Sequence, residues 1–231
     1  MSILFILYLQ LKNLSYDNNI KIKRKKDLMT LIVFIRHGQS ISNVNRILSD
    51  DINSYPLTDE GRRQVYNTAN ELKKISPKKI YSSPVLRAYQ TAMIIGEVLN
   101  IIPIIDDRLR ERELGELNNT KIDQFDHWKL RVARKELNVK GVEPWDSLKR
   151  RMVNFVESVI KEKETVIAVS HFDPIRAFLA YVLDLDDISA WGLHIPNASI
   201  TIVRCESINN CRILSVGAPI ITNELLSKLE V

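Results

Sequence analysis

Histidine and arginine side chains stand together where short apolar runs of the sequence end. Arg36 and His37 follow the apolar run 31–35, and His171 follows a second such run, 165–170. A neutral imidazole nitrogen can attack phosphorus and carry a phosphoryl group covalently, which divides one difficult displacement into two easier ones. Arginine offers a planar, permanently charged fork that matches the oxygens of that group. These residue types therefore indicate phosphoryl transfer.

Two further polar clusters follow other strand-like runs. Ser82–Pro84 closes the run 79–82, and Ser83 before Pro84 is predicted to be the N-cap of the next helix. Arg87 follows one helical turn later, and Glu111 lies a few residues past the run 101–105. A second arginine would supply another fork for phosphoryl oxygens. A carboxyl group is needed to protonate the leaving oxygen and later to take a proton from water. A phosphate dianion close to Glu111 should raise the pKa of that carboxyl and hold its proton in place.

The elements that must position these clusters alternate along the chain. Strands are predicted at 31–35, 79–82, 101–105 and 165–170, with a closing hairpin at 199–205 and 212–217. Helices are predicted at 58–76, 83–99, 120–139, 144–161 and 173–182. Alternating strands and helices favour an α/β fold with a largely parallel sheet covered on both faces. Ligands of such sheets bind beyond the carboxyl ends of the strands, so the four clusters should share one pocket.

The same clusters resemble the signature motifs of a known family, the histidine phosphatase superfamily in its phosphoglycerate-mutase-like branch. The matching segments are 36–40 with Asn43, 82–92, 109–115 and 169–176, and the resemblance extends over about residues 31–217. Four motifs in the family's order are far more specific than a single Arg-His-Gly. The resemblance implies a three-layer αβα sandwich around a mostly parallel six-stranded sheet.

The resemblance also implies a role for individual residues, carried over by motif position. His37 would be the phosphorylated nucleophile, and Glu111 would be the general acid and base. Three side chains would clamp the phosphoryl group: Arg36, Arg87 and His171. Three others would line the substrate side: Gln39, Ser40 and Asn43. The family needs no metal ion, so the resemblance implies no cofactor.

Three acidic residues have more than one interpretation. Glu113 is a second candidate for the acid, although the motif spacing favours Glu111. Asp173 precedes a proline, which favours a helix N-cap over a proton donor at the mouth of the site. Glu143 resembles a glutamate that opens a helix near the pocket in relatives. Because the family's Gly-Glu-Ser is Gly-Val-Glu-Pro here, an acid at a helix start is the default interpretation.

Hydrolysis of a phosphomonoester is the reaction that the sequence favours. Mutases of this family typically carry a long insertion that holds the glycerate carboxylate, whereas the stretch between Glu111 and Glu143 is short here and has no Tyr-Arg-Arg cluster. Phosphoglycerate mutase chemistry is therefore the second choice. A regulatory module that binds a phosphorylated ligand without catalysis is a third, disfavoured because every expected catalytic group is present.

The substrate is expected to be a small phosphorylated molecule, but the sequence does not identify it. The residues that would select it lie in the variable stretch 117–145. Its basic residues fit either a polyanionic substrate or a solvated helix, and the solvated helix is favoured: Lys121, Lys129, Arg131, Arg134, Lys135 and Lys140.

Composition places the chain among ordinary globular proteins, because 45% of its 231 residues are hydrophobic and 26% are charged. The net charge of +5 comes mostly from residues 1–28, which hold six lysines or arginines against two aspartates. We predict an accessory basic extension over 1–28, or a translation start misassigned upstream of Met29, and a catalytic domain over 29–231. No nucleic-acid partner is expected, because a solvated linker explains the basic run.

The N-terminal run and the two cysteines bear on the compartment of the cell in which the protein is expected. The apolar run at the N-terminus is too short to span a bilayer and lacks the marks of a secretory signal, so a cytoplasmic protein without a membrane span is expected. In that compartment Cys205 and Cys211 are predicted to be reduced thiols, although a disulfide across the hairpin is geometrically conceivable. A homodimer is left open.

Overall fold

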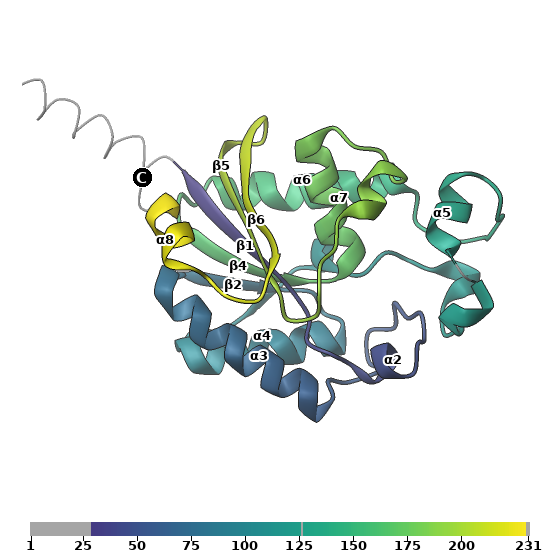
Figure 1. Ribbon diagram of the computed structural model, residues 1–231, viewed down its shortest axis with the longest axis horizontal. Helices are drawn as coiled ribbons and strands as arrows, with labels where there is room; N and C mark the ends of the chain where they lie inside the picture. The colour runs from purple at the N-terminus through teal and green to yellow at the C-terminus, as the bar shows by residue number, and fades with distance from the viewer. Residues whose placement is uncertain (1–28, 126, 230–231) are drawn as a thin grey trace, which may run out of the picture.

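The computed structural model describes residues 29–125 and 127–229. A six-stranded sheet in the order β3-β2-β4-β1-β5-β6 is covered by helices on both faces (Figure 1). This arrangement confirms the predicted three-layer αβα sandwich. The predicted basic extension 1–28 lies outside the described residues, so the boundary at residue 29 stays a prediction.

The strands are β1 (Thr30–Arg36), β2 (Lys79–Ser82), β3 (Ile104–Ile105), β4 (Thr165–Ser170), β5 (Ile200–Ser207) and β6 (Asn210–Ala218). The helices are α2 (Ile41–Val44), α3 (Asp59–Leu72), α4 (Leu86–Leu99), α5 (Trp128–Ala133), α6 (Trp145–Ile160), α7 (Phe172–Leu183) and α8 (Asn223–Leu229). Short 3₁₀ turns lie at Lys73–Ile75, Asp107–Leu109, Gly115–Leu117, Ile122–Phe125 and Ser189–Gly192. Among the described residues, no helix combines the length and the apolar character needed to cross a membrane.

The strand pairing explains why the polar clusters meet. β1 runs parallel to β4, which runs parallel to β2, and β2 runs parallel to β3. Only the contacts of β5 with β1 and β6 are antiparallel, so the sheet is mostly parallel as predicted. Arg36 and Ser170 are register partners at the carboxyl ends of β1 and β4. The residues that come next, His37 and His171, are therefore neighbours at one edge of the sheet.

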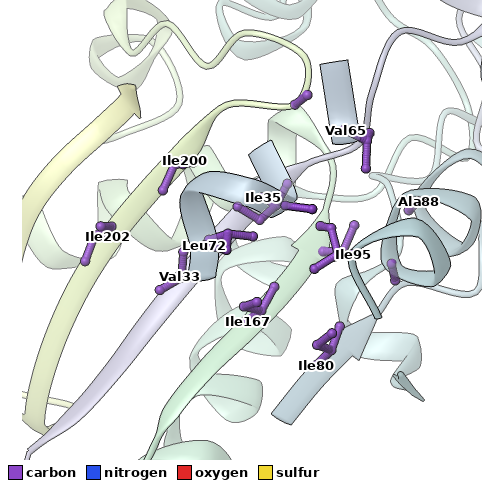
Figure 2. Close-up of a cluster of buried hydrophobic side chains, with 14 of the residues drawn as sticks. Val33, Ile35, Val65, Leu72, Ile80, Ala88, Ile95, Ile167, Ile200 and Ile202 are labelled. Atoms are coloured by element: carbon purple, nitrogen blue, oxygen red, sulfur yellow. The ribbon is translucent and has the colours of Figure 1, made fainter. Parts of the chain in front are cut away.

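Both faces of the central strands are buried, which accounts for their continuous apolar runs. Val33 and Ile35 of β1 pack in the cluster under α3 and α4, which Figure 2 shows. Ile32 and Phe34 point the other way, into the cluster under α6 and α7, because successive side chains of a strand face opposite sides. With helices packed on both faces, the strand ends hold their positions relative to one another.

Two predicted helix caps are wrong. α4 begins after Val85 and α7 begins after His171, so neither Ser83 nor Asp173 is the N-cap residue. The Ser83 hydroxyl instead bonds to the His171 ring at 2.8 Å, and Asp173 forms an ion pair with Lys129. Local cap preference was overridden in both places by contacts with residues distant in sequence.

Two predicted elements are shorter than expected, and two short helices were missed. The strand predicted at 101–105 is reduced to β3, because the Ile101 N–H donates to Gly96 O at the end of α4 and Pro103 has no N–H to give. The helix predicted at 120–139 contains only a 3₁₀ turn and the short α5. α2 and α8 were not predicted.

The prediction of two reduced cysteines is wrong for this structure, which joins Cys205 and Cys211 in a disulfide. The two residues are directly opposed register partners of β5 and β6, with their Cα atoms 4.1 Å apart. Their closeness follows from the register of the hairpin, which the sequence did not specify.

Candidate active site

A cavity of about 270 Å³ opens at the carboxyl ends of β1 and β4, on the side of the molecule where α2 and α5 lie (Figure 1). Its titratable and charged lining consists of Arg36, His37, Arg87, Glu111, Lys129 and Asp173. A larger hollow of about 680 Å³ over α4 contains none of these side chains. Because the catalytic candidates gather only in the smaller cavity, we take that cavity as the candidate active site.

His37 is held as a neutral imidazole with one nitrogen facing the cavity. Its Nδ1 lies 2.8 Å from Gly38 O, a contact that only a protonated Nδ1 can make, and its Nε2 lies 3.2 Å from Arg87 Nε, which donates to it. These two bonds assign the tautomer that leaves the lone pair on Nε2. Burial, followed by the charges of Arg87 and Arg36, holds the pKa of His37 well below its ordinary value. The nitrogen beside the cavity is thus unprotonated and has the lone pair that a nucleophile needs.

Gly38 allows the loop after β1 to pass close to α3. A Cβ built at this position would lie 2.6 Å from Gly61 O, closer than real side chains come to a backbone oxygen. The Gly38 N–H donates to Thr91 Oγ1 of α4 at 3.1 Å. The backbone that carries His37 is therefore fixed by both helices on this face of the sheet.

Two arginines leave buried N–H groups for an anion. Arg87 donates through NH2 to Ser49 O at 2.8 Å, and Arg36 donates through NH1 to Ile195 O at 2.8 Å. Among the described residues, Arg87 NH1 and Arg36 Nε have no hydrogen-bond partner although both atoms are buried. A buried donor without an acceptor costs about 1–3 kcal/mol, so a phosphoryl group beside these arginines would relieve that cost.

His171 is fully buried beside His37 and is not part of the cavity lining; the two ring centroids are 5.1 Å apart. Its Nε2 is 2.8 Å from Ser83 Oγ, and its buried Nδ1 has no hydrogen-bond partner among the described residues. Because Ser83 Oγ already accepts from the Val85 N–H, its own proton is available for Nε2. His171 can then carry its proton on Nδ1 and donate it to a phosphoryl oxygen. Burial, then Arg87 and His37, lower its pKa well below the ordinary value, so it is neutral as well.

Glu111 has the properties of a general acid. Its Oε2 lies 3.9 Å from His171 Nδ1, and its Oε1 accepts from the Arg112 N–H at 2.9 Å. Burial, with Asp173 as the second cause, raises the pKa of Glu111 above its ordinary value. The alternative acid, Glu113, has a side chain that is 61% exposed and does not line the cavity. The geometry favours Glu111 as the acid.

Asp173 lies in the cavity but keeps its charge. Burial alone would raise its pKa, but Lys129 and Arg176 lower it to about 2. A carboxylate that is ionised at neutral pH has no proton to give to a leaving group. The structure therefore disfavours the proton-donor interpretation of Asp173, and Glu111 remains the acid that the cavity offers.

The three residues expected on the substrate side lie in different places. Asn43 lines the cavity, where its Oδ1 accepts from the Ser40 N–H at 3.0 Å and from Asn197 Nδ2 at 3.2 Å. Ser40 and Gln39 lie outside the cavity lining. The Ser40 hydroxyl bonds to neighbouring side chains at the start of α2, and Gln39 Oε1 accepts from Thr58 Oγ1 at 2.8 Å. In this geometry Gln39 and Ser40 hold the loop that positions His37 and Asn43.

Sequence reasoning missed Arg151, which holds the loop that carries Glu111. From α6, Arg151 donates to the carbonyl oxygens of Arg108, Arg110 and Glu111 at 2.7–3.1 Å. Its guanidinium also forms two bonds of 2.8 Å to the carboxylate of Glu143. Glu143 is therefore part of a clamp on the acidic loop as well as an acid near a helix start. In the sequence, Arg151 resembles any other charge on an amphipathic helix.

Replacing Arg151 with methionine should destabilise the protein and slow turnover together. The change leaves the Glu143 carboxylate and three carbonyl oxygens without their donor, so the free energy of unfolding should fall by about 3 kcal/mol. Urea denaturation measures that loss, and kcat for an alkyl phosphate measures the displacement of Glu111. The neighbouring exposed Arg150 is the matched control, and equal effects of Arg150→Met and Arg151→Met would contradict the clamp.

Comparison with known proteins gives results that agree with this geometry. The chain matches the family model of the histidine phosphatase superfamily, branch 1, over residues 32–217. It is 37% identical over 205 residues to the 2,3-bisphosphoglycerate-dependent phosphoglycerate mutase of Thermoplasma acidophilum, covering 88% of this chain and all of that protein. It is 29% identical over 196 residues to phosphoserine phosphatase 1 of Hydrogenobacter thermophilus, covering 79% of this chain and 90% of that protein.

A solved structure shares the fold. The mycobacterial glucosyl-3-phosphoglycerate phosphatase superposes with a TM-score of 0.71 at 27% identity, covering 82% of this chain and 99% of that one. The named relatives include both a mutase and phosphatases. The comparisons therefore agree on phosphorylated substrates and leave open whether water or an alcohol receives the phosphoryl group.

Proposed function

The chain belongs to the histidine phosphatase superfamily, and on this premise we propose that it hydrolyses small phosphomonoesters through a phosphohistidine on His37, without a metal ion. The observation that best supports the proposal is the arrangement around His37 Nε2. A neutral, unprotonated nitrogen stands beside two arginine forks and within the same cavity as a carboxyl of raised pKa. Those are the groups that a double displacement at phosphorus requires.

The first displacement forms the bond between His37 Nε2 and phosphorus and breaks the bond between phosphorus and the alcohol oxygen. Glu111 gives its proton to that oxygen, so a neutral alcohol leaves. Arg36, Arg87 and the Nδ1 proton of His171 stabilise the charge on the three phosphoryl oxygens. The proton stays on His37 Nδ1 and is donated to Gly38 O in a hydrogen bond, which favours the positive charge that develops on the phosphorylated ring.

The second displacement returns the enzyme to its starting state. The Glu111 carboxylate takes a proton from water as the water oxygen attacks phosphorus. The bond between phosphorus and His37 Nε2 breaks, inorganic phosphate is released, and Glu111 is again protonated. Each group ends with the protons that it had at the start, so the cycle balances.

The pH dependence follows from the two pKa directions. Glu111 acts while protonated, so kcat/KM for an alkyl phosphate should fall as the pH rises through its raised pKa. His37 and His171 have pKa values well below the ordinary 6.5, so the acidic limb near pH 6 should come from the second ionisation of the substrate's phosphate alone. A pH series of kcat/KM for two esters whose phosphates differ in that pKa tests both limbs. An acidic limb near 6.5 that does not move with the pKa of the substrate would contradict the neutral state of the two histidines.

Metal independence is part of the proposal and has a direct test. Among the described residues, no three His, Cys, Asp or Glu side chains are grouped so that they could hold a metal ion. Turnover of p-nitrophenyl phosphate should be unchanged by an excess of EDTA. Loss of turnover that returns on adding a divalent cation would contradict the histidine mechanism.

Phosphoglycerate mutase activity is the second candidate, and the Thermoplasma acidophilum relative favours it. That protein is aligned over its whole length of 205 residues, so a chain without a long insertion carries the mutase name. The absence of an insertion here therefore does not separate the two reactions. The charged lining of the cavity favours hydrolysis, because three cations and two carboxyl groups are a poor match for a bisphosphorylated intermediate.

The two reactions differ in their products. With 3-phosphoglycerate and a trace of its bisphosphate, hydrolysis releases inorganic phosphate, whereas a mutase forms 2-phosphoglycerate. We expect phosphate release to dominate. The cavity volume of about 270 Å³ equals roughly nine water molecules at about 30 Å³ each, which suits a phosphoryl group with a few carbon atoms. We further propose a cytoplasmic location for an enzyme with such a substrate.

A further inference from the structure

A buried ion pair lies in the cavity wall, and neither of its members is assigned a contact with the phosphoryl group in the chemistry described above. Lys129 Nζ donates to Asp173 Oδ1 at 2.6 Å, and the two side chains are only 15% and 2% exposed. Both residues line the same cavity as His37. Lys129 comes from α5, in the stretch that was expected to be a solvated helix, so its burial shows that this expectation is wrong for Lys129.

A chain of further charged side chains, alternating in sign, extends from Asp173. Arg176 NH2 lies 3.5 Å from Asp173 Oδ1 and 2.7 Å from Asp187 Oδ1. Asp187 in turn accepts from Arg112 NH1 at 3.2 Å. The Arg176 guanidinium also stacks over the Trp145 ring at 4.6 Å. Separating one member of such a buried chain is costly, so Lys129 and Asp173 should stay paired when a substrate binds.

The charges that line the cavity sum to a small positive value. The cations are Arg36, Arg87 and Lys129. Asp173 is ionised, and Glu111 must be protonated to act as the acid. The resulting net charge of +2 balances a phosphomonoester dianion and leaves no positive charge for a second anionic group.

We propose that the Lys129–Asp173 pair makes the alcohol side of the cavity electrically neutral and so selects phosphomonoesters whose alcohol part carries no net charge. The inference rests on the proposed function and narrows its substrate class. A carboxylate on the alcohol part of the substrate would be desolvated beside Asp173, while Lys129, the cation of the cavity lining that contacts Asp173, is already engaged. A binding site discriminates against a ligand whose charged group would be buried there without a partner of opposite charge.

Two ligands that differ in a single group test the pair. Glycerol 3-phosphate and 3-phosphoglycerate differ only by a hydroxymethyl group against a carboxylate. Their dissociation constants are measured by calorimetry on the His37→Ala background, which should not turn them over, at about pH 7.5, where both phosphates are dianions. Glycerol 3-phosphate should bind about tenfold more tightly, a difference that corresponds to about 1.4 kcal/mol.

Replacing Asp173 and replacing Lys129 should change the preference for glycerol 3-phosphate in opposite directions. On the same background, Asp173→Asn frees Lys129 and should shift the ratio of the two constants about tenfold toward 3-phosphoglycerate. Lys129→Met leaves Asp173 without its partner and should shift the ratio further toward glycerol 3-phosphate. The double variant should return the ratio close to its starting value. Loss of packing would weaken both ligands alike and could not produce opposite shifts.

The control removes a carboxylate elsewhere. Glu224→Gln on α8, at the opposite end of the molecule from α5 (Figure 1), should leave the ratio unchanged. Equal affinity for the two ligands in the parent protein, or shifts of the same sign in Asp173→Asn and Lys129→Met, would overturn the inference. Since binding is measured without turnover, the result stands apart from the p-nitrophenyl phosphate assay, whose failure would instead overturn the proposed hydrolysis.

Discussion

His37→Ala should lower kcat for every phosphomonoester by about 10⁴-fold or more, because it removes the atom that attacks phosphorus. Among the described residues that line the cavity, His37 Nε2 is the unprotonated imidazole nitrogen beside both arginine forks. His171 cannot replace it, since its Nε2 accepts from Ser83 Oγ and lies outside the cavity lining, while its Nδ1 carries the proton. Steady-state turnover of p-nitrophenyl phosphate measures the loss.

The matched control for this change is His194→Ala. His194 is exposed and outside the cavity, so its replacement should leave kcat within about twofold of the parent. Circular dichroism and urea denaturation would show that His37→Ala remains folded. A folded His37→Ala variant that retained a tenth of the parent activity would contradict nucleophilic catalysis by His37.

Glu111→Gln should produce losses that depend on the leaving group. An alkyl alcohol leaves only when its oxygen is protonated, so kcat/KM for an alkyl phosphate should fall by about 10²–10⁴-fold. p-Nitrophenol departs as a stable anion, so its ester should lose far less. Glutamine keeps the shape of the side chain and removes the proton, which is the property under test.

Glu113→Gln is the control for Glu111→Gln, because its side chain is largely exposed two residues away. It should leave both substrates unaffected. Equal losses for the alkyl and nitrophenyl esters in Glu111→Gln would show that the residue positions the substrate and does not protonate it. The same comparison in Arg151→Met should resemble a weaker Glu111→Gln, since Arg151 acts through the acidic loop.

The strand-end clusters could be predicted from sequence because they depend on short-range order. Each cluster directly follows an apolar run or lies a few residues past one, and parallel strands bring their carboxyl ends to one edge of the sheet. The structure places Arg36, His37, Arg87 and Glu111 in the lining of one cavity. It places His171 against His37, with ring centroids 5.1 Å apart. The fold class followed from the same alternation of strands and helices.

The contacts around these clusters could not be predicted, because they join residues far apart in the chain. Ser83 and Asp173 have the sequence marks of helix caps, yet both side chains instead bind residues that are distant in the sequence. Lys129 lies in a basic stretch that favours a solvated helix, and its burial depends on how α5 packs against Asp173 and Phe172. Nothing in the local pattern of α6 distinguishes Arg151 from its exposed neighbours.

The two kinds of residue lie in different parts of the fold. The residues proposed to handle the phosphoryl group lie mostly at strand ends and in first helical turns, which the packed sheet holds in place. The residues expected to meet the alcohol part of the substrate, such as Lys129, come from the segment between Glu111 and Glu143, where the helical pattern is weak. Chemistry is thus readable from motifs in this chain, whereas specificity depends on a packing arrangement.

The most direct test of the account is to find the covalent intermediate. Rapid quenching of turnover with a radiolabelled phosphomonoester, followed by digestion and mass spectrometry, identifies the residue that carries the phosphoryl group. We expect one acid-labile, alkali-stable phosphate on His37, absent from His37→Ala. A label on any other residue, or a folded enzyme that turns over without forming a labelled intermediate, would contradict it.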